Sequence, residues 1–509
     1  MPKAAAFQEV VLSTTKTTEL VSDNVRTGRL RKLGPMLYTS NMIDPPESIV
    51  RRNVWQIVAA YCPGAVVTDR TGIECRPAED GSVFVVAERA SDVKLPGLTI
   101  RPRKGRPAMD SDRLFMGGLR FASEGRLFLE NMIPSRARKG ISRTLSKIEM
   151  EGHLDKLQAR DPEALNRIRD EARALAPVLG LEAEFTQLQK MIGGLLGSRP
   201  DAEPRAPAAV ARAAGRAYDA GRLEIFESLR AELSSMPPAI RRTPDLTPEG
   251  FDNLAFFESY FSNFIEGTEF EVEEAADIVF KNIIPAARPA DAHDVLGTFR
   301  VASNRQEMAV VPRTVEEFVA LLKRRHRVVM ELRPDKKPGR FKEIPNRVGP
   351  RQFVLPDLVE GTLARGFELY RSLAGAFERA TFMMYLVAET HPFDDGNGRI
   401  ARLMMNAEFA AVGEQRILIP IVYRNNYLSA LRALSNDKHA TPLVRVFDFA
   451  QRYARMIPWD SFARARFVME GTHAFVKPDQ ADEDGVVLRI PSPELLQEAV
   501  DRDPAQEPG

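Results

Sequence analysis

The stretch HPFDDGNGRIAR, residues 391–402, constrains the fold more than any other part of this chain. It follows the apolar run 376–389 and leads into 399–412, and both flanking segments repeat apolar residues at helical spacing. Because Pro392 disfavours helical geometry at the residue before it, a helix must end at or before His391. The pattern predicts two helices joined by a polar loop.

The loop also concentrates chemistry. Small residues at a helix N-terminus leave backbone N–H groups free to face an anion, and the helix dipole adds to the attraction. Asn397 can donate to a phosphate oxygen, Arg399 and Arg402 offer forks for further phosphates, and Asp395 suits Mg²⁺. With His391 as a base, this set predicts phosphoryl or nucleotidyl transfer. The alternative is a capped helix beside a surface histidine.

Bulk properties narrow the class of protein. The 509 residues predict roughly three domains. No apolar run approaches the ~18 residues of a membrane span, and the N-terminus lacks an apolar signal core, so we expect neither membrane insertion nor export. Cys62 and Cys75 are too few for a disulfide framework, which fits the cytoplasm. The net charge of +1 gives no overall signal for nucleic acid.

The first two hundred residues have a mixed character. Residues 1–105 are predicted as an α/β domain, because 82–88 and 97–103 have the composition of strands bounded by turn residues. A basic and then helical connecting region is expected over 106–196. The Pro/Ala-rich segment 197–209 is predicted to be a linker.

The rest of the chain is predicted to be helical. From 210 to 456 nearly every segment has helical periodicity, and 339–356 breaks it with Pro and Gly, which indicates an irregular hairpin. Residues 457–509 are expected to be an extension that ends in a loose polar tail. The predicted fold is therefore α+β and multidomain, with a mostly helical core, a β-hairpin and a smaller N-terminal α/β domain.

A basic segment offers a second type of partner. Between residues 101 and 147 lie twelve Lys or Arg residues against four Asp or Glu. A solvated surface is the ordinary explanation for such a run. Contact with DNA is the alternative, since clustered cations are the electrostatic footprint of nucleic-acid binding.

HPFDDGNGRIAR resembles the signature of the Fic family, His-x-Phe-x-Asp/Glu-Gly-Asn-Gly-Arg-x-x-Arg, with every defined position filled. The resemblance extends over roughly 245–456 and implies a Fic core, whose common activity moves AMP from ATP to a protein hydroxyl. It implies ATP and Mg²⁺ as cofactors and a hydroxyl-bearing protein as partner. The implied roles are His391 as base, Asp395 for Mg²⁺, Gly396, Asn397 and Gly398 for the α- and β-phosphates, Arg399 for the β-phosphate and Arg402 for the γ-phosphate.

A second motif lies upstream. SNFIEG resembles the family's inhibitory motif, Ser/Thr-x-x-x-Glu-Gly/Asn, which implies an inhibitory helix at about 247–267 with Ser262, Glu266 and Gly267 as its motif residues. Glu266 would pair with Arg402 and occupy the partner of the γ-phosphate. The alternative is an ordinary helix end with Gly267 as its C-cap.

The hairpin resembles the flap of Fic proteins, which covers the catalytic loop and binds an extended target by strand addition. The matching segment is FKEIPNRV, in which the expected target-binding residues are Phe341, Lys342, Glu343, Ile344, Arg347 and Val348. Pro345 removes one donor from any ladder, so the edge that receives the target stays open.

Residues 22–41 resemble the end of a winged helix, and the sequence to about 105 is similar to DNA-binding antitoxins of abortive-infection systems. A plain α/β scaffold that recruits the target is the alternative.

Together the motifs predict an autoinhibited protein AMP-transferase, for which we also allow a homodimer. One alternative is a DNA-binding regulator, as in toxin–antitoxin systems, that uses the Fic core as a sensing module. Another is a Fic transferase that moves UMP, phosphocholine or phosphate. Removal of AMP by the same site also stays open.

Overall fold

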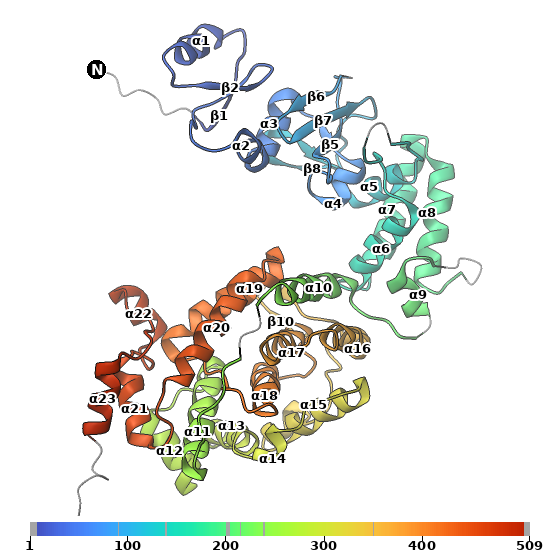
Figure 1. Ribbon diagram of the computed structural model, residues 1–509. Helices are drawn as coiled ribbons and strands as arrows, with labels where there is room; N and C mark the ends of the chain where they lie inside the picture. The colour runs from blue at the N-terminus through green and yellow to red at the C-terminus, as the bar shows by residue number, and fades with distance from the viewer. Residues whose placement is uncertain are drawn as a thin grey trace, which may run out of the picture. The chain divides into compact units, whose positions relative to one another are not determined.

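The computed structural model describes residues 8–89, 91–137, 140–199, 204–213, 215–237, 240–349 and 351–502. The chain forms two compact units, Met1–Ala214 and Gly215–Gly509. The first contains the two larger sheets and several helices, and the second is helical apart from one two-stranded sheet (Figure 1), which confirms the predicted α+β class. Within the described residues, no helix combines the length and the apolar character that a membrane span needs.

The first unit begins with a small sheet. Strands β1 (Val10–Leu12), β2 (Arg31–Gly34) and β3 (Leu37–Thr39) pair antiparallel in the order β1-β3-β2, and helix α1 (Thr18–Arg26) precedes the β2–β3 hairpin. A helix followed by a hairpin is compatible with the end of a winged helix. That resemblance stays a prediction.

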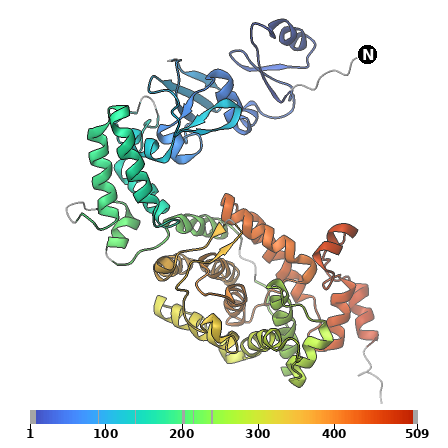
Figure 2. The same cartoon turned by 180° about the vertical axis from the view of Figure 1, so that it is seen from behind.

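A six-stranded sheet follows, in the order β6-β7-β5-β4-β9-β8. Figure 2 shows the strands of this unit from behind. The strands are β4 (Val66–Val67), β5 (Ser82–Val86), β6 (Val93–Leu95), β7 (Leu98–Arg103), β8 (Arg113–Leu114) and β9 (Arg120–Phe121). Around it lie α2 (Pro46–Arg52), α3 (Val54–Tyr61) and α4 (Asp69–Glu74). The predicted boundary at residue 105 is wrong because β8 and β9 complete this sheet. Each is two residues long, too short to show an alternating pattern.

The expected linker 197–209 is also partly wrong. The unit ends with helices α5 (Glu124–Asn131), α6 (Lys147–Gln158), α7 (Ala164–Leu179), α8 (Glu182–Leu195) and α9 (Pro207–Ala213). The Glu151 carboxylate accepts the N–H groups of Arg205 and Ala206, and Ala206 is buried. Residues 204–209 therefore pack within the first unit, whereas 200–203 lie outside the described residues.

Much of the basic segment 101–147 is neutralised internally. Arg126 is fully buried and pairs with Asp112 and Glu130, and Arg103 pairs with Asp69 and Glu130. Arg101 and Arg143 also pair with carboxylates of the same unit. Arg138 and Lys139 lie outside the described residues. Because these four arginines pair with carboxylates of the same unit, fewer positive charges are available to an anionic partner than the count of twelve indicated.

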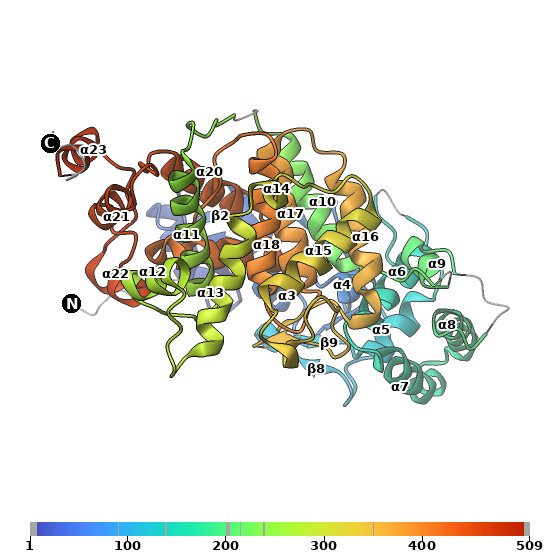
Figure 3. The same cartoon turned by 90° about the horizontal axis from the view of Figure 1, so that it is seen from below.

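The second unit is a helical bundle around α17 (Ala376–Thr390) and α18 (Asn397–Ala410). Figure 3 shows α11 and α13 on one side of this pair and α15 and α16 on the other. The other helices are α10 (Ala220–Ser234), α11 (Pro248–Ile265), α12 (Val272–Lys281), α13 (Pro289–Ala302), α14 (Arg305–Met308), α15 (Val315–Val329), α16 (Val359–Tyr370), α19 (Arg424–Asp437), α20 (Thr441–Arg455), α21 (Phe462–Gly471), α22 (Pro478–Asp484) and α23 (Pro493–Asp501).

The C-terminal extension packs on α11 rather than trailing away. Phe256 and Phe257 of α11 share one buried cluster with Trp459 and Met469, and Ala499 of α23 is buried as well. The expectation of a loose tail is wrong for residues 493–501, because apolar residues at helical spacing give α23 a face to bury. Residues 503–509 lie outside the described residues.

Candidate active site

The loop between α17 and α18 has the predicted helix–loop–helix form. His391 ends α17 with a φ of 52°, and Gly396 precedes α18 with a φ of 72°. A Cβ at position 396 would lie 2.8 Å from the Met330 sulfur, so glycine is needed for space as well as for backbone conformation. The left-handed geometry at His391 turns its ring out of the helix.

His391 is held as a neutral base. Its Nδ1 lies 3.3 Å from the Ala388 carbonyl, which assigns the proton to Nδ1 and leaves the Nε2 lone pair available. The Phe353 ring stacks on the imidazole with centroids 3.8 Å apart and planes 7° apart. Burial, together with the charge of Lys342, lowers the pKa of His391 to about 4. The imidazole is therefore unprotonated near pH 7.

Asn397 stabilises the loop through its side-chain amide. Its Oδ1 accepts the N–H of Phe393 at 2.8 Å and its Nδ2 donates to the Phe393 carbonyl at 2.9 Å. Asn346 donates to the same carbonyl at 3.0 Å. One N–H of the amide is therefore used within the loop, and donation to a phosphate, which would use the second N–H, stays a prediction.

His326 of α15 connects the catalytic loop to the segment that precedes the flap. The Gly339 N–H donates to His326 Nδ1 at 2.8 Å, so Nε2 carries the proton and donates to the Asp395 carbonyl at 3.0 Å. The buried ring also stacks on Phe393 with centroids 3.7 Å apart. Sequence reasoning missed this residue. Its one signal was a histidine on the buried face of a predicted helix, which more often belongs to an ordinary core.

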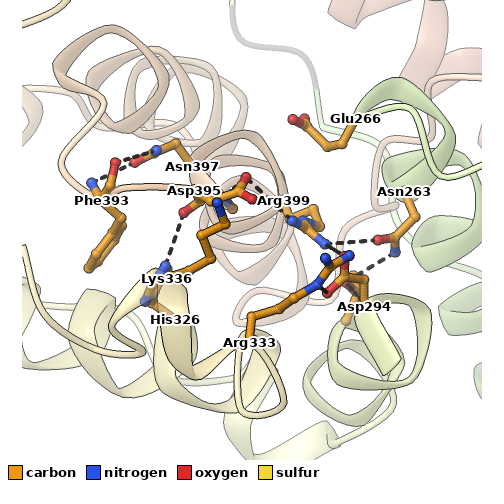
Figure 4. A network of polar contacts seen from close by, with 12 residues as sticks. Asn263, Glu266, Asp294, His326, Arg333, Lys336, Phe393, Asp395, Asn397 and Arg399 are labelled. Carbon is orange, nitrogen blue, oxygen red and sulfur yellow. Dashed lines mark hydrogen bonds and ion pairs between the residues drawn. The ribbon is translucent and has the colours of Figure 1, made fainter. Parts of the chain in front are cut away.

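Arg399 forms a buried ion pair that the sequence did not predict (Figure 4). Its guanidinium lies 2.8 Å from Asp294 of α13 and 3.7 Å from Asp395, and its side chain is only 3% exposed. Asp294 also binds Arg333 at 2.7 Å. Asp294 and Arg333 were not predicted. From the sequence, Arg399 was expected to offer its guanidinium to phosphate. In the structure, the Asp294 carboxylate already pairs with this guanidinium and orients it.

Arg402 forms the contact that the inhibitory motif predicted. It donates to Glu266 at 2.7 Å, to the Ser262 hydroxyl at 2.9 Å and to the Ser262 carbonyl at 2.9 Å. A Cβ at Gly398 would lie 2.1 Å from Glu266 Oε1, so the carboxylate rests against the first turn of α18. Glu266 thus lies over both the Arg402 guanidinium and the predicted phosphate cradle.

The end of α11 also has the geometry of an ordinary helix end, with Glu266 as the C-cap and a glycine directly after it. Gly267 has a φ of 92°, and the Thr268 N–H donates to the Asn263 carbonyl. The capping interpretation of SNFIEG and the pairing of Glu266 with Arg402 are therefore compatible.

The flap is a short hairpin of β10 (Arg347–Val348) and β11 (Arg351–Gln352). The expected target-binding residues Phe341, Lys342, Glu343 and Ile344 precede it and form no strand. Ile344 and Val348 are exposed. The expectation that Lys342 binds the target is wrong, because the residue is buried. Its backbone N–H donates to the Pro392 carbonyl at 2.9 Å, and its ammonium donates to Asn346 at 2.7 Å. It cannot present its side chain to a target, and burial lowers its pKa to about 7.

No group of three or more possible metal ligands occurs among the residues that the structure describes. Asp395 supplies one partly exposed carboxylate at the start of the cradle, where its Oδ1 accepts the Gly396 N–H at 2.6 Å. Mg²⁺ is commonly held by one or two carboxylates together with substrate phosphates, so one such group fits this ion.

The family comparison agrees with this geometry. Residues 318–408 match the model of the Fic/DOC family. This span of the chain is therefore similar to a Fic domain. A protein adenylyltransferase Fic from Drosophila willistoni is 26% identical over 250 residues, covering 47% of this chain and 48% of the relative. The corresponding protein of Drosophila yakuba is 35% identical over 81 residues, covering 16% of each chain.

The chain therefore spans about half the length of the first of these relatives. Among solved structures, a fragment of Fic-1 from C. elegans is 20% identical with a TM-score of 0.34, covering 64% of this chain and 94% of that chain. A Fic-domain signaling protein from Bacteroides thetaiotaomicron is 20% identical with a TM-score of 0.36, covering 48% of this chain and 97% of that chain.

Proposed function

We propose that this chain is an autoinhibited protein adenylyltransferase, which moves AMP from ATP to a hydroxyl side chain of a protein. The observation that carries the proposal is the placement of a neutral His391 at one end of a loop whose other end is the N-terminus of α18. A base and an anion cradle six residues apart suit attack on a bound phosphate. The names of the relatives supply the group that is transferred.

In this mechanism the His391 Nε2 accepts the proton of the target hydroxyl as its oxygen attacks the α-phosphorus of ATP. The new bond joins that oxygen to the phosphorus, the bond between the α-phosphorus and the bridging oxygen breaks, and pyrophosphate leaves. The Ala388 carbonyl keeps the imidazole in the tautomer that can accept this proton. The Phe353 ring prevents the imidazole from turning away.

Phosphate binding would use the backbone of the first turn of α18 and the guanidinium of Arg402. Gly396 and Gly398 let the phosphates approach the backbone closely, and Asn397 contributes through its own N–H. Arg399 would act at the β-phosphate while it remains paired with Asp294, which lowers its net charge but fixes its direction.

Asp395 would hold Mg²⁺ together with the phosphates. The bound ion would neutralise phosphate charge during transfer. The bond from His326 to the Asp395 carbonyl fixes the backbone on which this carboxylate is placed.

Autoinhibition would follow from competition for one position. The Glu266 carboxylate contacts Arg402 and lies against Gly398, so a γ-phosphate could reach neither while Glu266 stays in place. ATP would then bind in a pose that does not align the α-phosphorus with the target hydroxyl.

The test is incubation of the Glu266→Gly protein with labelled ATP, Mg²⁺ and cell lysate, followed by mass identification of any adduct. An added mass of AMP on a Ser, Thr or Tyr residue supports the proposal. An adduct of UMP, phosphocholine or phosphate, formed with the corresponding donor and not with ATP, supports another Fic transferase instead. Loss of AMP from a premodified target would indicate the reverse reaction.

A second function, DNA binding by the first unit, is favoured by one observation. Helix α1 is followed directly by the β2–β3 hairpin, and Arg29 and Lys32 are exposed on that stretch. A helix with an adjacent basic hairpin is the part of a winged helix that contacts the groove and the backbone of duplex DNA.

A further inference from the structure

Helix α10 packs on the helical core although it ends at Ser234, well before the span 318–408 that matches the Fic model. Phe226 of α10 packs edge-on against Phe382 and Tyr385 of α17, with ring centroids 6.1 and 6.0 Å apart. Phe226 is fully buried. The helix that ends at the catalytic histidine is therefore supported by an element that the family motif does not include.

Arg222, in the first turn of α10, joins three elements. It forms an ion pair with Glu389 in the last turn of α17 and donates from Nη2 to the Gln352 carbonyl of β11 at 2.6 Å. The Glu389 side chain is 3% exposed, and it also binds Arg351 of β11 and the Ser435 hydroxyl of α19. A buried carboxylate must be paired, so these contacts fix the base of the flap against the end of α17.

The contact with Gln352 matters because the next residue is Phe353. Phe353 carries the ring that stacks on His391, and Glu389 lies two residues before His391 on α17. Arg222 thus binds both chain segments that place this stacked pair. A displacement of β11 would move the Phe353 ring and release the imidazole from its stacked orientation.

We propose that Arg222 is a positioning residue for the transfer reaction, acting through Gln352, Phe353 and Glu389 to hold His391 in line with the target hydroxyl. The expected effect on kcat rests on the proposed function. The expected effect on the stacking of His391 and Phe353 rests on the contacts alone. Arg222 would not touch ATP. Its loss should therefore lower kcat and leave the binding of ATP nearly unchanged.

The competing interpretation is that Arg222 forms an ordinary stabilising ion pair. The chain offers a matched control for it in Arg241, which pairs with Asp448 and donates to Gln451 in α20. The Arg241 side chain is 16% exposed, against 15% for Arg222. Within the described part of the chain, the Arg241 side chain contacts α20 rather than the flap or the catalytic loop, so Arg241→Met removes the ion pair of a similarly buried arginine without touching His391.

The kinetic experiment compares Arg222→Met, Arg222→Lys and Arg241→Met, each combined with Glu266→Gly. We expect Arg222→Met to lower kcat by ~10-fold or more, with KM for ATP changed by less than ~2-fold, which corresponds to at least ~1.4 kcal/mol lost in the transition state. Arg222→Lys should recover part of the rate, since a lysine can still pair with Glu389. Arg241→Met should match its parent in kcat.

A spectroscopic readout separates this inference from the proposed function. With histidine labelled at the ring carbon, the six histidines of the chain give few NMR signals, and His391→Ala assigns one of them. The His391 signal should show the ring-current shift of Phe353 in the parent and in Arg241→Met, and lose most of it in Arg222→Met. If that shift persists in folded Arg222→Met, or if kcat is unchanged, Arg222 is not a positioning residue. If no variant transfers AMP but the shift is lost, the proposed function fails while the structural role of Arg222 stands.

Discussion

Glu266→Gly removes the carboxylate that contacts both proposed phosphate partners, the Arg402 guanidinium and the first turn of α18 at Gly398. The substitution should leave Arg402 in place, because two of its three hydrogen bonds in this contact go to the hydroxyl and carbonyl of Ser262. A freed but still oriented guanidinium can bind the γ-phosphate. We therefore expect activation rather than loss of the site.

The size of the effect follows from the geometry of the pair. A hydrogen bond between charged groups is worth about 1.5–3 kcal/mol. The Arg402 side chain is only 5% exposed, but Glu266 is 29% exposed, so solvent screening places this pair at the lower end. Relief of about 1.4 kcal/mol of competition raises the rate of self-modification or target modification by at least ~10-fold.

The assay measures incorporation of label from ATP into the full-length protein and into a target, with Mg²⁺ present. Glu266→Gln keeps the length of the side chain and removes its charge, so it should fall between the parent and Glu266→Gly. Arg402→Ala should not be activated, because the same guanidinium that pairs with Glu266 is also the proposed partner of the γ-phosphate. The double variant should resemble Arg402→Ala. An unchanged rate in Glu266→Gly, with ATP binding confirmed by calorimetry, would show that SNFIEG is only a helix end.

Three further outcomes are expected. His391→Ala should lower transfer by ~10²–10⁴-fold while calorimetry shows ATP affinity retained, and near-parental turnover would exclude His391 as the base. In the Glu266→Gly protein, the rate from pH 8 to 5 should not show the fall near pH 6.5 that an ordinary histidine would give, because burial, together with the charge of Lys342, lowers the pKa of His391 to about 4. The charges of Glu266 and Asp395 raise this pKa in the parent, so loss of the Glu266 carboxylate does not bring it back toward 6.5. Full-length protein should bind duplex DNA with an affinity that falls steeply as salt rises, and Arg29→Gln with Lys32→Gln should weaken it; no binding at low salt favours the scaffold interpretation.

The parts of the site that were predictable from sequence are those fixed by local spacing. The C-terminal end of α17 and the N-terminal end of α18 follow from Pro392 and the glycines of the loop. The contact between Glu266, at the C-terminal end of α11, and Arg402 was expected because two motifs were recognised together. The pairing of Arg399 with Asp294 could not be predicted, because residues on α13 and α18 meet only through the packing of the bundle. The same holds for His326.

Each motif arginine has a carboxylate partner, yet only one partner can be exchanged easily for a phosphate. Asp294 lies within α13, is buried, and also binds Arg333, so its departure would take the nearest carboxylate away from the buried Arg399 guanidinium. Glu266 is the C-cap of α11, partly exposed, and beside Gly267, so its side chain can turn into solvent while the buried helix that ends at Ile265 stays packed. Relief of the proposed inhibition therefore needs a local rearrangement at one helix end. The orientation of Arg399, by contrast, is a fixed property of the fold, so its proposed contact with the β-phosphate should not depend on whether Glu266 is in place.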